Sequence, residues 1–499
     1  MKRRNFIKIS SVSLAALLVD GCASHSNYSI EFRNDMSVGH LVIGSDQFPI
    51  TKSLNTDVMI VGGGIAGMTA AYQLKDRDFL LFELSDVLGG SSSGGRYKNT
   101  PLCHGAHYDL SYPSNYGRDV LRMLEELDII QYDTFTDSWK FVDKQYLISK
   151  NRESRTFAHD EFRKDVLPDE PEKADFIALM QTFTGTMPMP TRLIDETHRY
   201  LNDVSFLEWL KGKITVSEQF IEGLDYHMKD DFGAGSASVS ALAGIHYFAC
   251  RPYGVKPVEL FSPPEGNSYF INKIHEKLPS DRIITSSLVK LIKEIGEGFE
   301  VEVIDVHKKE ITLVSCRKII YAGQKHALKY IFPKEFPLFL KNSYAPWVVV
   351  NVVLKNALEN EAFWQNEILS DDPSLLGFVD SSAQYSPEKG SQVLTVYYCF
   401  KPEEREMMSL IETRKEIFID QTVDRLEHYF DKSLINRIEK IYITQMGHAM
   451  PIPIPGYLFV DANDFRSNPN LMFAGVDNGR LPLLFEALDS GIVAVQGWG

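Results

Sequence analysis

Apolar and polar positions along the chain divide it into alternating blocks of two kinds. The first kind combines buried-strand runs, glycine turns and helices, and it occurs three times: at residues 57–83, 268–323 and 471–496. Between these blocks, residues 115–250 have mainly helical periodicity. The second intervening block has strand-like runs at 347–354 and 392–400, followed by a helical segment at 412–430. This order predicts an α/β protein built from two interleaved domains rather than five successive units.

A glycine-rich turn joins the first predicted strand to the first predicted helix, and residues 62–67 read Gly-Gly-Gly-Ile-Ala-Gly. Gly62 permits the tight turn, Gly64 lets a pyrophosphate approach the backbone, and Gly67 lets the helix and strand pack closely. The helix begins near Ile65 and Ala66, where free N–H groups and a partial positive charge favour phosphate. The motif predicts a dinucleotide-binding unit.

The second predicted strand, at 79–82, ends at Glu83, which stands twenty-one residues after Gly62. Its carboxylate could accept hydrogen bonds from ribose hydroxyls and would repel the extra phosphate of NADP. A lone glycine motif is weak, but strand, glycines, helix, strand and acid in this register are specific. They do not by themselves distinguish FAD from NAD.

After Glu83 the sequence resembles the flavin amine oxidase superfamily, which includes monoamine and polyamine oxidases and the phytoene-desaturase-type enzymes. Members carry a second glycine motif that lies over the flavin pyrophosphate, and Gly89 and Gly90 stand in its place. The family usually has Arg after the paired glycines, whereas this chain has Ser91. Arg96 stands a few residues further on and is the candidate to supply the missing charge.

Three more segments extend this resemblance towards the C-terminus. Gly105 and Ala106 resemble the segment that passes beside the flavin ring, and Val289 resembles the valine whose backbone meets the adenine. Gly475 and Asp477 match the C-terminal flavin motif, in which a strand returns and an acid meets the ribityl-phosphate region. The resemblance therefore implies FAD as the cofactor.

The resemblance covers about residues 56–497 and implies the domain boundaries. A discontinuous FAD/NAD(P)-binding Rossmann-like three-layer domain is interleaved with an α+β substrate domain. The first is expected at 55–115, 256–335 and 465–499, and the second at 116–255 and 336–464. Residues 23–54 are expected to form a polar lead-in with one strand-like piece at 41–43.

A flavin carries the redox chemistry itself, so the protein needs no nucleophile. The resemblance implies a lysine near the flavin, shortly after the strand that ends the middle block; Lys325 and Lys329 are the candidates, and alignment favours Lys329. A solvated surface lysine is the competing interpretation. His104 and His107 flank the flavin-side segment, and His107 is taken as the candidate proton acceptor. Histidines hydrogen-bonded within the fold are the alternative.

Family amine oxidases use an aromatic residue two positions before the Glu of the final helix to sandwich the amine. This chain has Leu484 at that position, with Phe485 next to it and Glu486 following. We therefore expect an oxidoreductase of amine oxidase type that removes a hydride from a C–N bond of a small amine or polyamine-like substrate, with reoxidation by O₂ or a quinone. Two alternatives stay open: desaturase-like oxidation of a C–C bond, and a non-redox flavin-fold isomerase or binding protein.

The formal net charge of −15 argues against nucleic acid as a partner. Arg3 and Arg4 precede an apolar run at 9–19, which is too short to cross about 30 Å of hydrocarbon as a helix. The segment resembles a twin-arginine export signal, with an ordinary secretory signal as the alternative. Cys22 resembles a lipoprotein cleavage site, so we expect a periplasmic, membrane-anchored protein with residues 1–22 removed or lipidated. The other cysteines have no metal-ligand spacing, and no metal site is predicted.

Overall fold

The computed structural model describes residues 28–498 except 35, 45, 108–114, 150, 251–259, 360–361 and 386–390. The predicted export signal and the lipid-anchor residue Cys22 lie outside the described residues. Among the described residues, every helix is too short or too polar to cross a bilayer.

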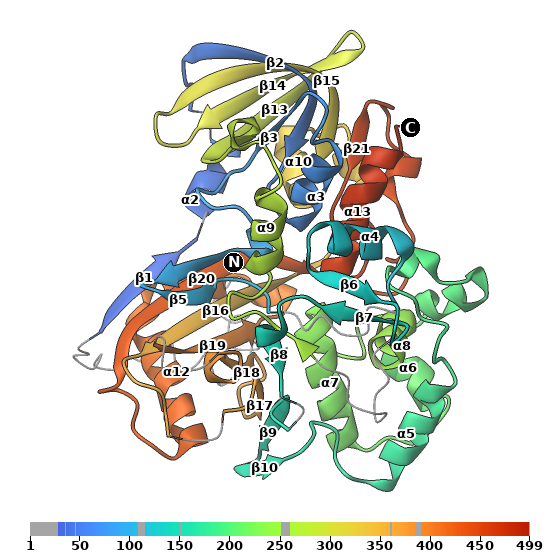
Figure 1. The fold of residues 1–499 in the computed structure, drawn as a ribbon, viewed down its shortest axis with the longest axis vertical. Coiled ribbons are helices and arrows are strands. Elements are labelled where there is room, and N and C mark those ends of the chain that lie inside the picture. The colour runs from blue at the N-terminus through green and yellow to red at the C-terminus, as the bar shows by residue number, and fades with distance from the viewer. Residues whose placement is uncertain are drawn as a thin grey trace, which may run out of the picture.

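The first of two large sheets builds the nucleotide-type domain, at the top of Figure 1. Its strand order is β12-β3-β2-β15-β14-β13, and β21 also pairs with β15. The strands are β2 (Ile50–Val61), β3 (Phe79–Phe82), β12 (Ile283–Ile284), β13 (Ser287–Ile295), β14 (Gly298–Asp305), β15 (Glu310–Tyr321) and β21 (Leu471–Phe473). Strands β3, β2, β15 and β21 run parallel to one another, so their carboxyl ends meet at one edge of the sheet; β14 is antiparallel to β15.

The apolar run of β2 is buried on both faces, as its continuous hydrophobicity requires. Ile60 packs in the cluster that contains helices α3 (Ile65–Gln73) and α13 (Leu484–Gln496). Met59 and Val61 point to the other face, where β14 and helix α10 (Leu328–Ile331) pack. These three layers are the Rossmann-like arrangement.

The second large sheet has the strand order β1-β20-β16-β19-β18-β17-β9-β10. The strands are β1 (Ser29–Arg33), β9 (Ser154–Ala158), β10 (Glu161–Arg163), β16 (Tyr344–Leu354), β17 (Gln365–Leu369), β18 (Leu375–Asp380), β19 (Gln392–Cys399) and β20 (Ile438–Pro451). Helices α11 (Met407–Thr413) and α12 (Lys415–Phe430) cover one face, where alternate β16 residues such as Val348 and Val350 are buried. The intervening residues, such as Trp347 and Asn351, point to the opposite face.

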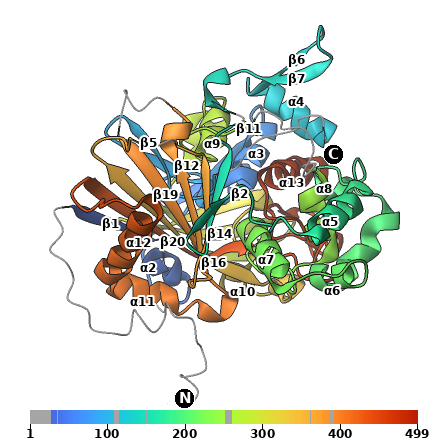
Figure 2. The same cartoon turned by 90° about the horizontal axis from the view of Figure 1, so that it is seen from below.

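A helical block lies beside this sheet (Figure 2). It consists of α5 (Pro171–Gln181), α6 (Phe206–Lys211), α7 (Glu218–Phe232) and α8 (Ala241–Cys250). The remaining elements are α2 (Met36–Gly39), α4 (Arg118–Glu126), α9 (Ser268–His275) and the short strands β4 (Gly94–Tyr97), β5 (Thr100–Cys103), β6 (Ile130–Asp133), β7 (Ser138–Phe141), β8 (Leu147–Ile148) and β11 (Leu260–Phe261).

The predicted fold class is confirmed, and three local expectations need correction. The prediction of a strand at 41–43 is wrong, because the chain forms a 3₁₀ turn at His40–Val42. In this turn Leu41 and Val42 pack against Leu288 and Ile311. The block at 115–250 contains a β6–β7 hairpin and the short strands β8 to β10 as well as helices. The expected lead-in also supplies β1, which pairs with β20, and the first residues of β2.

Candidate functional site

The candidate site is the edge where the parallel strands of the first sheet end. Val61 and Tyr321 are paired across β2 and β15, and Tyr321 is paired with Phe473 across β15 and β21. Phe82 is paired with Val61 on the other side. The residues that follow each strand therefore converge, and in open α/β sheets this edge is where ligands bind.

The turn from β2 to α3 has the geometry that the glycine motif predicts. Gly62 has a φ of +101°, in the region that favours glycine. A Cβ on Gly67 would lie 1.9 Å from the Gly62 carbonyl oxygen, so only glycine allows this approach of helix to turn. Helix α3 starts after Gly64 without a side-chain cap, and its first helical hydrogen bond runs from Met68 N–H to Gly64 O at 2.9 Å. The N–H groups of residues 65–67 have no intrahelical acceptor and suit an anionic ligand.

Glu83 lies beside this turn and is 8% exposed. Its Oε2 accepts a hydrogen bond from Gly63 N–H at 2.5 Å, and its Oε1 accepts one from Ser85 N–H at 2.9 Å. The Glu83 carbonyl oxygen accepts a hydrogen bond from Ser287 N–H at 2.8 Å, two residues before Val289. The structure thus brings the fingerprint, the predicted ribose-binding acid and the strand of the predicted adenine contact together.

The paired glycines lie directly over the first turn. Gly89 N–H donates to the Gly63 carbonyl oxygen at 2.9 Å, and Gly89 and Gly90 both have positive φ. Ser91 is exposed and its carbonyl oxygen accepts a hydrogen bond from Ala106 N–H at 2.9 Å. A Cβ on Gly105 would lie 2.1 Å from the same oxygen. The second glycine loop and the predicted flavin-side segment are therefore neighbours.

Arg96, the predicted substitute for the missing family arginine, lies in a groove that residues 62–67 of the glycine fingerprint do not line. Its exposed side chain lines a groove of about 560 Å³ together with Glu265, His275 and the outer residues 86–88 of the glycine loop. The fingerprint residues 62–67 do not line this groove. Arg96 Nη1 makes one long hydrogen bond, at 3.4 Å, to the Asn99 carbonyl oxygen.

Lys325 and Asp477 form a buried ion pair at the strand ends. Lys325 is 0% exposed and Asp477 is 7% exposed. The Lys325 ammonium group donates to Asp477 Oδ1 at 2.8 Å, and Lys325 N–H donates to Asp477 Oδ2 at 2.9 Å. Gly475, with a φ of +121°, leaves room for the pair, since a Cβ there would lie 3.0 Å from Asp477 Oδ1 and 3.2 Å from Lys325 Nζ.

The structure does not bring Lys329 into this arrangement. Its side chain is exposed, and its ammonium group lies 5.5 Å from the centre of the Tyr330 ring. Of the two lysines that the sequence offered, Lys325 is the one among the converging strand ends.

Sequence reasoning missed a pair of histidines next to the ion pair. The rings of His326 and His448 are stacked, with centroids 3.7 Å apart and planes 14° apart. Burial lowers the pKa of His326 to about 4 and that of His448 to about 3, so both imidazoles are neutral at pH 7. Tyr344 lies edge-on to both rings and donates its hydroxyl hydrogen bond to Asp477 Oδ2 at 3.2 Å. Since His448 and Tyr344 belong to the second sheet, no local sequence signal could have placed them here.

His107 contacts the second sheet through Tyr397. The distance from His107 Nδ1 to the Tyr397 hydroxyl oxygen is 2.6 Å, and Trp347 lies edge-on to Tyr397 at 5.9 Å. His107 Nε2 and Trp347 Nε1 are buried without a hydrogen-bond partner among the described residues. Burial lowers the pKa of His107 and of His104 to about 4. His107 is thus a neutral imidazole that is held by Tyr397 at Nδ1 and also interacts with the Pro264 backbone.

Helix α13 is attached to the helical block by a buried ionic network. Glu486 Oε1 accepts a hydrogen bond from Thr191 N–H at 2.7 Å. Asp489 Oδ2 accepts hydrogen bonds from Arg480 and from Arg192, both at 2.7 Å. These charges explain why the predicted last helix carries acids on a face that is buried.

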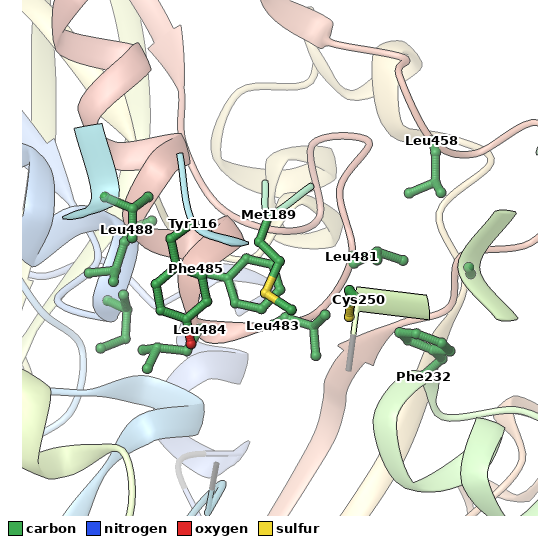
Figure 3. Close-up of a cluster of buried hydrophobic side chains, with 14 of the residues drawn as sticks. Tyr116, Met189, Phe232, Cys250, Leu458, Leu481, Leu483, Leu484, Phe485 and Leu488 are labelled. Atoms are coloured by element: carbon green, nitrogen blue, oxygen red, sulfur yellow. The ribbon is translucent and has the colours of Figure 1, made fainter. Parts of the chain in front are cut away.

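The aromatic residue nearest the expected amine cage points into the core. Phe485 is 0% exposed and stacks on Tyr116 with ring centroids 5.8 Å apart. Figure 3 shows it in a cluster of buried apolar side chains that also contains Met189 and Leu484. Phe485 therefore does not replace the aromatic residue that the family has at position 484.

Solved oxidase structures share this architecture at low sequence identity. Wild-type putrescine oxidase bound to putrescine is 14% identical with a TM-score of 0.62, and the match covers 89% of this chain and 99% of that chain. Cyclohexylamine oxidase from Brevibacterium oxydans IH-35A is 15% identical with a TM-score of 0.62, with coverage of 89% and 99%. The chain has the fold of these oxidases. A putative protoporphyrinogen oxidase from Exiguobacterium sp. 255-15 is also similar, at 12% identity, a TM-score of 0.62, and coverage of 90% and 99%.

At the level of sequence, a family model matches the N-terminal part of the chain. Residues 60–127 match the family described as NAD(P)-binding Rossmann-like domain. No curated protein matches the sequence. The comparisons therefore agree with a Rossmann-like nucleotide domain inside an oxidase fold.

Proposed function

We propose that this chain is a FAD-dependent oxidoreductase. The observation that carries the proposal is the convergence of the glycine fingerprint, Glu83 and the Gly475–Asp477 return at one sheet edge, within an oxidase fold. The residues present fit the cofactor, because the start of α3 offers free N–H groups and Gly67 and Gly105 leave no room for a Cβ. Two glycine loops in contact make a cradle for a pyrophosphate rather than for a single phosphate.

The residues around the sheet edge would have distinct roles in binding FAD and the substrate. The N–H groups of residues 65–67 and the Gly89–Gly90 loop would hold the pyrophosphate, and Glu83 would accept the ribose hydroxyls. The bound flavin supplies the hydride-accepting chemistry. His107, a buried neutral imidazole beside the predicted flavin-side segment, would make the polar contact with the substrate or accept its proton.

The substrate that this proposal favours is an amine or polyamine, oxidised at a C–N bond, with O₂ or a quinone as electron acceptor. Support comes from similarity to a putrescine oxidase and a cyclohexylamine oxidase, and from a net charge of −15 that suits a cationic substrate. Oxidation of a C–C bond is the second candidate. Leu484 at the expected cage position and the similarity to a putative protoporphyrinogen oxidase favour it.

The decisive experiment is anaerobic titration of the purified mature protein. The flavin absorbance is recorded first, then again after addition of putrescine, of cyclohexylamine and of protoporphyrinogen. Bleaching by the amines supports C–N oxidation, and bleaching by the porphyrinogen alone supports C–C oxidation. Protein that contains flavin but is reduced by no donor would refute the oxidoreductase proposal and favour the non-redox alternative.

We further propose that the protein is exported by the twin-arginine route and anchored through a lipid on Cys22. The support is the sequence alone: Arg3-Arg4 ahead of the apolar run at 9–19, and Cys22 after it. Cells expressing the wild type and Cys22→Ser are labelled with a radioactive fatty acid and fractionated. Label in the wild type that is lost in C22S supports anchoring, whereas equal distribution of both proteins in the soluble fraction would contradict it.

A further inference from the structure

Lys325 lies at the carboxyl ends of β15 and β21, and all of its ammonium N–H donors are used within the protein. Lys325 opens a 3₁₀ turn (Lys325–Ala327) after β15, and Asp477 follows β21, the strand paired with β15. The ammonium group donates to three acceptors: Asp477 Oδ1 at 2.8 Å, the Ala474 carbonyl oxygen at 2.6 Å and the Gly323 carbonyl oxygen at 3.1 Å. An ammonium group has three N–H donors, so all of them are used.

The same residue holds both oxygens of the acid. Lys325 N–H donates to Asp477 Oδ2, while its side chain holds Oδ1. Asp477 is also fixed from the second sheet, by the Tyr344 hydroxyl at 3.2 Å and by Asn342 Nδ2, which donates to the Asp477 carbonyl oxygen at 2.7 Å. One carboxylate therefore connects the ends of β15 and β21 with the start of β16.

The Lys325–Asp477 ion pair lies at the sheet edge where the FAD pyrophosphate is expected, so its net charge affects binding of the cofactor. A carboxylate that is 7% exposed is costly to bury unless an opposite charge compensates it. FAD carries a negatively charged pyrophosphate, which an uncompensated carboxylate at the same sheet edge would repel. Lys325 makes the edge neutral while leaving Asp477 in a fixed position.

We propose that Lys325 is a positioning residue for FAD, which acts through Asp477 and the two strand ends and does not contact the cofactor. This inference rests on the proposed function for its ligand. It differs from the sequence expectation of a lysine near the flavin, because here the ammonium group is fully occupied by the protein.

The test uses the full-length apoprotein and FAD itself as the probe. Four proteins are compared: wild type, Lys325→Met, Asp477→Asn and the double variant. Lys329→Met is the matched control, because it removes the same charge from an exposed lysine four residues away. FAD affinity is measured by fluorescence titration, and the midpoint of thermal unfolding is measured without FAD.

We expect K325M to weaken FAD binding at least tenfold and to lower the apoprotein midpoint, with K329M equal to wild type in both. The double variant K325M/D477N should bind FAD more tightly than K325M, because it carries no unpaired buried charge. Additive losses in the double variant would mean that Lys325 contacts FAD directly and would overturn the proposal. A lower midpoint with unchanged FAD affinity would reduce Lys325 to a structural role and would also overturn it.

The experiment distinguishes failure of the Lys325 proposal from failure of the proposed FAD-dependent function. If the wild type itself fails to bind FAD, the assignment of the cofactor is wrong. Coupling between Lys325 and Asp477 would still be visible in the apoprotein midpoints, since it needs no cofactor.

Discussion

Gly67→Ala tests whether the close packing of helix and turn is what makes the phosphate cradle. The added Cβ would lie 1.9 Å from the Gly62 carbonyl oxygen, whereas real Cβ contacts essentially never fall below 3.0 Å. The neighbour is backbone, so no side-chain rotation can relieve the clash. Helix α3 must therefore move away from the turn by about 1 Å. Helix α13 restrains that movement on the other side, because its Gly491 packs so closely that a Cβ there would lie 2.4 Å from the Ala66 carbonyl oxygen.

The size of the effect follows from these two restraints. Overpacking in a dense interior costs about 1 to 3 kcal/mol where side chains can adjust. Here both contacts are with main-chain oxygens, so we expect about 3 kcal/mol of destabilisation or more. The same displacement shifts the N–H groups of residues 65–67 relative to Glu83, so FAD affinity should fall at least tenfold.

The assay compares G67A with Gly44→Ala, since a Cβ on Gly44 would meet its nearest neighbour at an ordinary 3.7 Å. FAD content after purification and the thermal midpoint of the apoprotein are measured for both variants. We expect G44A to match the wild type and G67A to lose flavin and several degrees of stability. If G67A retains flavin and its midpoint equals that of G44A, the argument from close packing is refuted.

Three further predictions address the contacts around the site. Tyr397→Phe removes the hydroxyl that lies 2.6 Å from His107 Nδ1 and donates to the Gly105 carbonyl oxygen at 3.0 Å, so kcat should fall about tenfold or more; equal pH profiles and kcat for variant and wild type would contradict this. His326→Gln should reduce the slope with which the unfolding free energy falls as the pH is lowered. Its folded pKa of about 4 lies below the unfolded value of about 6.5, so protons bind the unfolded chain preferentially between these values and stability falls as pH falls, by at most about 1.4 kcal/mol per pH unit. Chemical denaturation at several pH values measures the slope, and an unchanged slope would refute this. Asp489→Ala removes the 2.7 Å acceptor of the Arg480 guanidinium, which is 6% exposed and keeps only Glu486 at 3.4 Å, and should lower the unfolding free energy by about 3 kcal/mol; a loss below about 1 kcal/mol in the same denaturation experiment would show the network to be unimportant.

The Rossmann-like half could be predicted because its determinants are local. The run at 57–61, the glycine spacing and the acid at Glu83 all act within thirty residues of each other, and each has one physical solution. The second sheet has no such signal. Strand β1 pairs with β20 more than 400 residues later, with Ser29 opposite Lys440, and neither strand's sequence specifies its partner. Pairing of that kind is decided by the tertiary structure.

The site was only partly predictable for the same reason. Lys325 and Lys329 both follow the same strand, and position alone does not show which one points inward. The 3₁₀ turn after β15 decides it, by placing Lys325 on Asp477 and Lys329 in solvent. A signal was present nonetheless: an acid four residues after the end of the buried strand β21 needs a compensating cation, and a lysine after the neighbouring strand is well placed to provide it. His448 had no comparable signal.

The remaining ambiguity about the substrate now has a structural cause. The family cage needs an aromatic ring at the start of α13, and Phe485 is one residue away from that position. Leu484 and Phe485 both lie in the buried apolar cluster, where Phe485 stacks on Tyr116, so neither position supplies an aromatic ring for an amine cage. Two aromatic residues of the second sheet, Tyr397 and Trp347, lie edge-to-face beside His107. Tyr397→Phe and the anaerobic amine titration therefore both test the proposal that the surface around His107 receives an amine substrate.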